Sequence, residues 1–205
     1  MNKRHLAAIL FICGVPANAA PSVVVHQPID TPTERQALRK LTFCVAERRP
    51  RWAHQLVSYP YLSDAQASAA AELVSGRDNC LGAPEVAVAF RISGVAGAVA
   101  EYFVRSDLGT SDLRRVSAAL ATAPPLNVSE DFALCVASRN PAAAVDLVRS
   151  ELGSADEMQT ASALANGVPS CTMPGERVQV DLQALRALIA TALYRAVTAS
   201  SWSNG

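Results

Sequence analysis

Apolar residues recur every three or four positions along much of the chain, which is the spacing of one face of a helix. Leu38 and Val45 follow this spacing behind Thr31-Pro32, a helix-capping residue and a proline suited to the first turn. Pro50 ends the segment, because the residue before a proline is displaced from the helical region. The pattern therefore predicts a helix that begins near Thr31 and ends before Pro50.

The sequence around this predicted helix end occurs twice. FCVAERRP at 43–50 returns as LCVASRNP at 134–141, and residues 44–80 match residues 135–171 in thirteen of 37 columns without a gap. Two cysteines, a proline and a glycine are among the matches, and composition alone does not easily align them. We therefore predict an internal duplication, in which the offset falls from 91 to 90 residues after the second cysteine.

Both units predict the same order of helices. In the second unit Ser129-Glu130-Asp131 is expected to cap the first helix and Pro141 to end it. A short second helix then carries a Leu-Val pair, at 56–57 in one unit and at 147–148 in the other.

The third helix of each unit has a predicted start and a predicted end. Ser63 and Ser154 are N-cap residues at matching positions. Gly76 and Gly167 stand where the end of a helix needs left-handed backbone.

Beyond the second cysteine of each unit, apolar residues alternate with small or polar ones, which indicates a short strand. The alternating residues are Val86, Val88, Phe90 and Ile92 in the first unit and Val178, Val180 and Leu182 in the second. The two strands are expected to pair with each other across the units. Closing helices are predicted at 94–105 and 183–197.

These elements predict a mostly α-helical fold of two tandem homologous units, each with one short strand and one internal disulfide. Unit 1 covers 31–106 and unit 2 covers 126–198, with a connecting helix or linker at 107–125. An extended lead at 20–30 precedes the units, and a flexible tail at 199–205 follows them.

Residues 1–19 have the layout of a secretory signal peptide. The basic pair Lys3-Arg4 precedes an apolar run, and Ala17-Asn18-Ala19 forms a small-residue cleavage site. The run is too short to span a bilayer, which takes about 20 residues. Cys13 raises the alternative of a lipoprotein, but Ile12 stands where lipoprotein processing needs a small residue. We expect a periplasmic or secreted protein of a Gram-negative bacterium, without stable membrane insertion once the signal is removed.

Four cysteines follow the predicted signal, and three disulfide connectivities are open to them. The equal spacing of 36 residues favours Cys44–Cys80 and Cys135–Cys171. A metal site or a thiol-redox pair is the alternative, and either would be indicated by a close pair such as C-x2-C, which the sequence lacks.

Composition argues against several classes of partner. Without Lys3 and Arg4 the chain carries 16 basic and 18 acidic residues, so no basic excess favours nucleic acid or anionic lipid. The sequence has no phosphate-binding loop, dinucleotide fingerprint or metal-ligand cluster. We therefore predict no cofactor and no metal.

One segment differs sharply between the units. RWAHQLVSYPYLSD at 51–64 carries four bulky ring side chains where the second unit has smaller ones, and they are Trp52, His54, Tyr59 and Tyr61. Aromatic side chains beside a proline turn can form a binding surface, because they bury a large area with little loss of entropy. The alternative is that they cover the core beneath a bent connection. We take the four as candidate binding residues.

Three functions fit these features. The first is a non-enzymatic scaffold that binds an envelope protein or peptide. The second is a carrier that holds a small apolar ligand between the two units. The third is a hydrolase that uses His54 with Ser58 or Ser63 and Asp64, but no nucleophile elbow frames such a site. We assign no catalytic residue, and an enzyme is the less favoured interpretation.

The layout resembles a group of secreted proteins of alphaproteobacteria in which a Cys-containing helix leads to a second cysteine and a closing helix. In that group the closing helix ends in a Tyr-Arg-like pair, and here LYRA stands at 193–196. The resemblance spans most of the exported chain, and it implies secretion but no activity.

Overall fold

The computed structural model describes residues 23–26, 31–75, 80, 92–107, 113–173 and 178–202, and over these residues the fold is mostly helical. The elements in chain order are β1 (Val23–His26), α1 (Pro32–Arg48), α2 (Pro50–Ser58), α3 (Asp64–Ser75), α4 (Ile92–Asp107), α5 (Leu113–Thr122), α6 (Val128–Arg139), α7 (Pro141–Arg149), α8 (Ala155–Ala165), the 3₁₀ helix η1 (Val168–Cys171), β2 (Val178–Asp181) and α9 (Leu182–Trp202). The predicted signal peptide and residues 86–91 of the first predicted strand lie outside the described residues.

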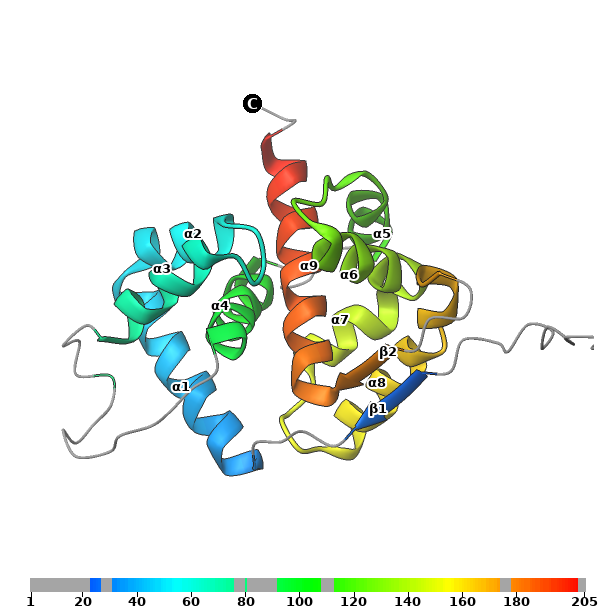
Figure 1. The fold of residues 1–205 in the computed structure, drawn as a ribbon, viewed down its shortest axis with the longest axis horizontal. Helices are drawn as coiled ribbons and strands as arrows, with labels where there is room; N and C mark the ends of the chain where they lie inside the picture. The colour runs from blue at the N-terminus through cyan, green and yellow to red at the C-terminus, as the bar shows by residue number, and fades with distance from the viewer. Residues whose placement is uncertain are drawn as a thin grey trace, which may run out of the picture.

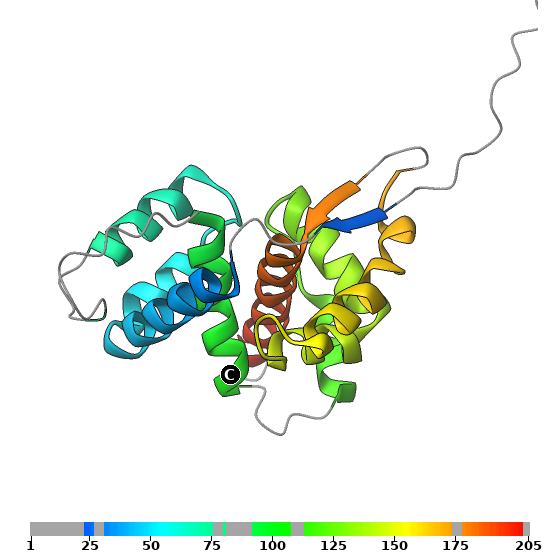
Figure 2. The ribbon, with the colours of Figure 1, turned by 90° about the horizontal axis from the view of Figure 1, so that it is seen from below.

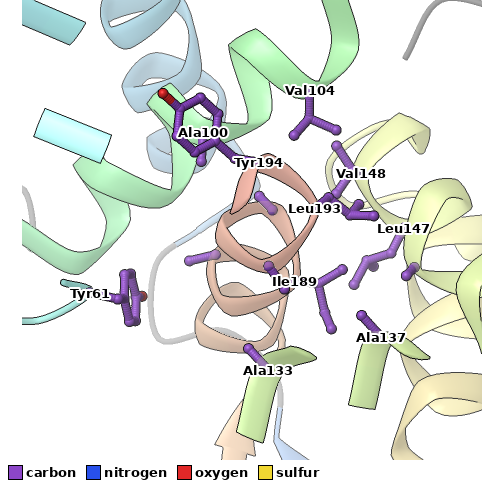
Figure 3. Packing of buried hydrophobic residues seen from close by; sticks show 14 of the residues in the cluster. Tyr61, Ala100, Val104, Ala133, Ala137, Leu147, Val148, Ile189, Leu193 and Tyr194 are labelled. Carbon is purple, nitrogen blue, oxygen red and sulfur yellow. The ribbon is translucent and has the colours of Figure 1, made fainter. Parts of the chain in front are cut away.

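The helices form two groups that share one core. Helices α1–α4 lie on one side and α5–α8 on the other, with α9 between them (Figure 1). Seen from below, α4 and α9 lie beside each other at the junction (Figure 2). Figure 3 shows Ile189 and Leu193 of α9 directed toward α6 and α7. The buried apolar side chains form a single cluster from Leu38 in α1 to Ala196 in α9, so the two groups are not separate domains.

We divide the helices into an N-terminal half (α1–α4) and a C-terminal half (α6–α9), which α5 connects. Helices α1 and α2 meet at Pro50, and α6 and α7 meet at Pro141, 91 residues later. Disulfides join Cys44 to Cys80 and Cys135 to Cys171, each with a sequence separation of 36. The predicted disulfide pairing is therefore confirmed.

The turn before the third helix is also the same in both halves. Leu62 has φ 64° and Gly153, 91 positions later, has φ 79°. The N–H of Leu62 donates to Gln66, and the N–H of Gly153 donates to Glu157, again at matching positions. A left-handed residue therefore occurs at the same point of both turns, although only one of them is glycine.

Local signals predicted most helix boundaries correctly. Thr31 and Glu34 form a capping box at the start of α1, with Pro32 as its first residue. Ser63 accepts a hydrogen bond from the N–H of Gln66, and Ser154 accepts one from the N–H of Glu157. The connecting helix appears as α5, before Pro124-Pro125.

Two predicted caps were wrong. The N-cap of α6 is Asn127 rather than Ser129, because the amide oxygen of Asn127 accepts the N–H of Glu130. Gly167 has φ −83° and so is not left-handed. A Cβ at this position would lie 3.2 Å from the Cβ of Arg139, so glycine allows the chain to pack closely against the end of α6.

The strand predictions were partly wrong. Val178 and Val180 lie in β2, but Leu182 begins α9 and Ile92 begins α4. Among the described residues β2 pairs in parallel with β1, in the register Val23 to Val178, and the predicted pairing with residues 86–91 lies outside them. The lead that we expected to be only extended therefore contributes a strand, which satisfies backbone groups that β2 would otherwise leave unpaired.

The predicted tail at 199–205 was also partly wrong, because α9 continues to Trp202. No proline or glycine interrupts residues 183–202, so nothing in the sequence forces the helix to end at Val197.

The two closing helices meet at Gly97 and Ala187, which are 90 residues apart and so occupy matching positions. A Cβ built on Gly97 would lie 2.3 Å from the Cβ of Ala187 and 2.6 Å from its Cα. Such distances are far below van der Waals contact, so α4 and α9 reach their present separation only because residue 97 has no side chain.

None of the described helices is long and apolar enough to cross a bilayer.

The helix crossing generates a first prediction. Gly97→Ala should lower the free energy of unfolding by roughly 1–3 kcal/mol, because the added methyl group must push two helices apart. Urea unfolding of the full chain measures this loss. Ala187→Gly should instead cost about 1 kcal/mol through helix propensity alone. If Gly97→Ala is neutral or stabilising, the close approach described here is wrong.

Candidate functional site

Trp52 and His54 do not share a surface. Successive residues of a helix are rotated by about 100°, so residues two apart point in nearly opposite directions. The buried stripe of α2 contains Ala53, Leu56 and Val57, and the two candidates flank it on either side. Trp52 packs partly against the core under the guanidinium of Arg49, whose Cζ is 4.6 Å from the ring centroid.

The two tyrosines are also separated. Tyr59 is half-buried, and its hydroxyl accepts a hydrogen bond from the side chain of Gln55. Tyr61 is only 3% exposed and belongs to the core, where burial raises the pKa of its hydroxyl well above the ordinary range. Tyr61 is therefore excluded from any exposed binding surface, and for this residue the alternative of a core-covering role is correct.

His54 instead belongs to a group of packed ring side chains that come from four helices. Its exposed imidazole stacks on Phe103 of α4, with 3.9 Å between centroids, and Nδ1 lies 3.2 Å from the hydroxyl of Tyr194. Phe103 contacts Tyr102, which in turn meets Phe43 of α1 edge to face at 5.3 Å. Phe43 and Tyr102 are half-buried, so the group reaches the surface at three rings. We call Phe43, His54 and Tyr102 the aromatic face.

In the described structure no hydrogen bond joins the residues of the hypothetical hydrolase to one another. His54 is paired with Tyr194, while the hydroxyl of Ser58 donates to the carbonyl of Gln55 in its own helix. The hydroxyl of Ser63 caps α3. Within the described ranges, no group of three or more His, Cys, Asp or Glu side chains is placed to hold a metal ion.

A buried network of charged side chains lies at the junction of the two halves. Arg186 of α9 donates to both oxygens of Glu101 in α4, at 2.9 Å each, and to Glu157 of α8 at 3.0 Å. Arg35 of α1 also donates to both oxygens of Glu157. The side chains of these four residues are at most 5% exposed. The network therefore ties four helices together inside the protein.

Neighbouring charges keep the network ionised. Burial would raise the pKa of Glu157, but the hydrogen bonds from Arg35 and from the N–H of Gly153, with the charges of Arg35 and Arg186, outweigh it and lower that pKa. Burial would lower the pKa of Arg186, but the hydrogen bonds and charges of Glu101 and Glu157 raise it. Each of these groups is thus held in its charged form by its partners.

Two further arginines bring the network to the surface. Arg105 donates to Glu101 and to carbonyls at the end of α7, and burial lowers its pKa. Arg39 donates through Nη2 to Glu151, whose side chain is 73% exposed. The Nη1 of Arg39 is buried and donates no hydrogen bond to any of the described residues; it lies 3.7 Å from an oxygen of Glu101.

Arg105 and Arg195 bind reciprocally across the junction. Arg105 donates to the carbonyl of Ser150 at the end of α7, and Arg195 donates to the carbonyl of Tyr59 at the end of α2. Tyr59 and Ser150 are 91 residues apart, so matching arginines bind matching carbonyls of the opposite half. Arg195 does not lie at the end of its own helix, because α9 continues for seven residues beyond it. Each arginine caps the second helix of the other half.

Glu130 completes the contacts of Arg195. Its two oxygens accept from Arg195, from the N–H of Tyr61 and from the N–H of Leu126. The amide of Asn127 donates to the carbonyl of Tyr61. These bonds hold the turn after α2 against the start of α6.

A pocket of about 40 Å³ opens beside the charged network. Its lining includes Arg35, Arg39, Glu101 and Arg186, together with Leu38 and Gly97. It lies among α1, α4 and α9, so both halves contribute to it. Arg39 also lies over the ring of Phe43, with Cζ 5.8 Å from the centroid, and so joins the pocket to the aromatic face.

Sequence reasoning missed this network, although one signal was present. Arg186 falls between Leu182 and Ile189 at helical spacing, which places a charged residue on the buried stripe of α9. A charge at such a position needs a buried partner. The two acidic partners also differ between the units: Glu101 aligns with the neutral Thr191, and Glu157 aligns with the neutral Gln66.

Comparisons with family models, with curated protein sequences and with solved structures gave no match to this chain.

The network generates a prediction for stability. Arg186→Ala should lower the free energy of unfolding by about 3–5 kcal/mol, because it leaves two buried carboxylates without their shared partner. Arg39→Gln, which removes the same charge at the surface end, should cost no more than about 1 kcal/mol. Chemical unfolding monitored by circular dichroism measures both. Equal losses in the two variants would contradict the central place of Arg186.

The lowered pKa of Glu157 generates a prediction for acid. A depressed carboxyl pKa stabilises the fold above the ordinary value of 4.5, and this contribution is lost as the pH falls through the folded pKa. Glu157→Gln should be less stable near neutral pH, but its stability should fall less steeply below pH 4.5. Urea titrations at a series of acidic pH values give both slopes. Parallel slopes would show that Glu157 takes up no extra proton on unfolding.

Proposed function

We propose that this protein is an exported, disulfide-stabilised helical scaffold that binds a protein or peptide partner through the aromatic face. The observation that carries this proposal is a chain of ring contacts in which His54 is exposed and Phe43 and Tyr102 are half-buried, with Phe103 joining His54 to Tyr102. Rigid rings whose partners already fix their positions lose little entropy on binding. The C-terminal half has Val145 at the position of His54, and this side chain is 2% exposed.

The small volume of the pocket beside the charged network does not support the carrier hypothesis. A carrier of an apolar ligand needs a cavity between the halves that is large enough to enclose the ligand. The pocket there holds only about 40 Å³, and its lining combines three arginines and a glutamate with apolar residues such as Leu38 and Leu152. A cavity of this size takes on the order of three water molecules.

Two structural features support the proposed export and the proposed duplication. Two disulfides between distant residues are typical of proteins that mature in an oxidising compartment. Matching disulfides, matching left-handed residues and reciprocal arginine contacts favour a common origin of the two halves. We propose a periplasmic or secreted location on the same grounds.

Photo-crosslinking tests the aromatic face. A benzophenone amino acid replaces Tyr102 in one variant and Trp52, on the opposite flank of α2, in a matched control. Irradiation in the native host should give a specific adduct from position 102 but not from position 52, and His54→Ala in the first variant should reduce its yield. The adduct is identified by mass spectrometry.

Other adduct patterns would overturn the proposal. An adduct from position 52 alone would place the binding surface on the Trp52 side. Adducts from neither position would contradict a binding role for this half.

A further inference from the structure

We infer that the junction pocket is a carboxylate site, and that it receives the C-terminal carboxylate of a peptide lying on the aromatic face. The statement that the carboxylate belongs to a peptide rests on the proposed function. The carboxylate site itself rests on the charges, hydrogen bonds and size of the pocket.

The charges around the pocket favour an anion. Four guanidinium groups gather here, from Arg35, Arg39, Arg105 and Arg186, against two buried carboxylates, Glu101 and Glu157. The third acid, Glu151, is largely in solvent. Arg35 and Arg186 balance the two buried carboxylates, so the positive excess comes from Arg39 and Arg105, whose side chains are 20% and 25% exposed. One more carboxylate beside them would form charge-assisted hydrogen bonds.

The hydrogen bonds identify where the anion binds. Glu157 already accepts from two arginines and from the N–H of Gly153, and Glu101 accepts from Arg186 and Arg105. Glu101 lines the pocket and would repel an anion, but its charge is compensated by these two partners. The buried Nη1 of Arg39 donates to no acceptor in the described structure, and it is therefore the donor that a carboxylate would engage.

The size of the pocket selects the group that enters it. About 40 Å³ accommodates a carboxylate but not a larger acid in full. The rest of the ligand must lie outside, and Arg39 connects the pocket to the rings of Phe43 and Tyr102. A chain with a carboxylate at its end and an apolar side chain beside it matches this pair of features, and a peptide C-terminus has that chemistry.

Calorimetric titration of the full-length chain in chloride-free buffer tests the inference. The probes are acetyl-Ala-Ala-Phe with a free carboxylate, the same peptide with a C-terminal amide, and acetate. The free acid should bind at least about tenfold more tightly than the amide, which is the effect of a charge-assisted hydrogen bond. Binding of acetate alone, at no lower affinity than the peptide acid, would retain the site but assign it to small free acids.

Substitutions of Arg39 and of its partner Glu151 test whether Arg39 binds the carboxylate. Arg39→Gln should weaken binding of the free acid at least about tenfold, while Arg51→Gln, which removes an exposed charge on α2, should leave it unchanged. Glu151→Gln should tighten binding, because it releases Nη2 of Arg39 from its exposed partner. This second variant keeps the test decisive even if Arg39→Gln is poorly folded.

Three results would overturn the carboxylate site: equal binding of acid and amide, no binding of either acid, or unchanged binding by both Arg39→Gln and Glu151→Gln. The proposed function fails separately. If the Tyr102 crosslink persists and acid and amide bind equally, the aromatic face still binds a partner while the pocket takes no carboxylate.

Discussion

The close approach of α4 and α9 at Gly97 is the constraint on which the rest of the structure depends. With no side chain at that residue, the two closing helices lie near enough for each to reach the opposite half. Arg186 of α9 can then bridge Glu101 of α4 and Glu157 of α8, and Arg105 of α4 can reach the end of α7. A wider separation would lengthen the bonds that join α4 to α9 and to α7. One missing methyl group therefore determines the geometry of the core, of the charged network and of the pocket beside it.

The charged network has a different role from the apolar core. A buried ion pair contributes little net stability compared with well-packed apolar side chains, because its charges must leave water. Its value lies in specificity, since Glu101, Arg186 and Glu157 satisfy each other only when four helices are correctly placed. Its surface end, at Arg39, is where the least completely bonded guanidinium lies.

Much of the fold could be predicted from the sequence because it depends on local chemistry. Proline and serine mark helix boundaries through their own backbone and side-chain bonds, and equal spacing was enough to pair the cysteines. The pairing of β1 with β2 could not be found in this way, because it joins residues more than 150 positions apart. The buried partners of Arg186 come from distant helices for the same reason. The separation of Trp52 from His54, in contrast, followed from helix geometry alone and could have been predicted.

The reciprocal bonds of Arg105 and Arg195 have a consequence for how such a fold can arise. Contacts in which residue i of one part meets residue j of the other, and j meets i, define an isologous interface, the kind that joins two identical subunits. A single half-length polypeptide with this arginine and this carbonyl could therefore form the same contacts as a homodimer. Linking the two copies through α5 makes assembly independent of concentration. It also allows the two halves to differ, as they do in the charged network at their junction and in the aromatic face of the N-terminal half.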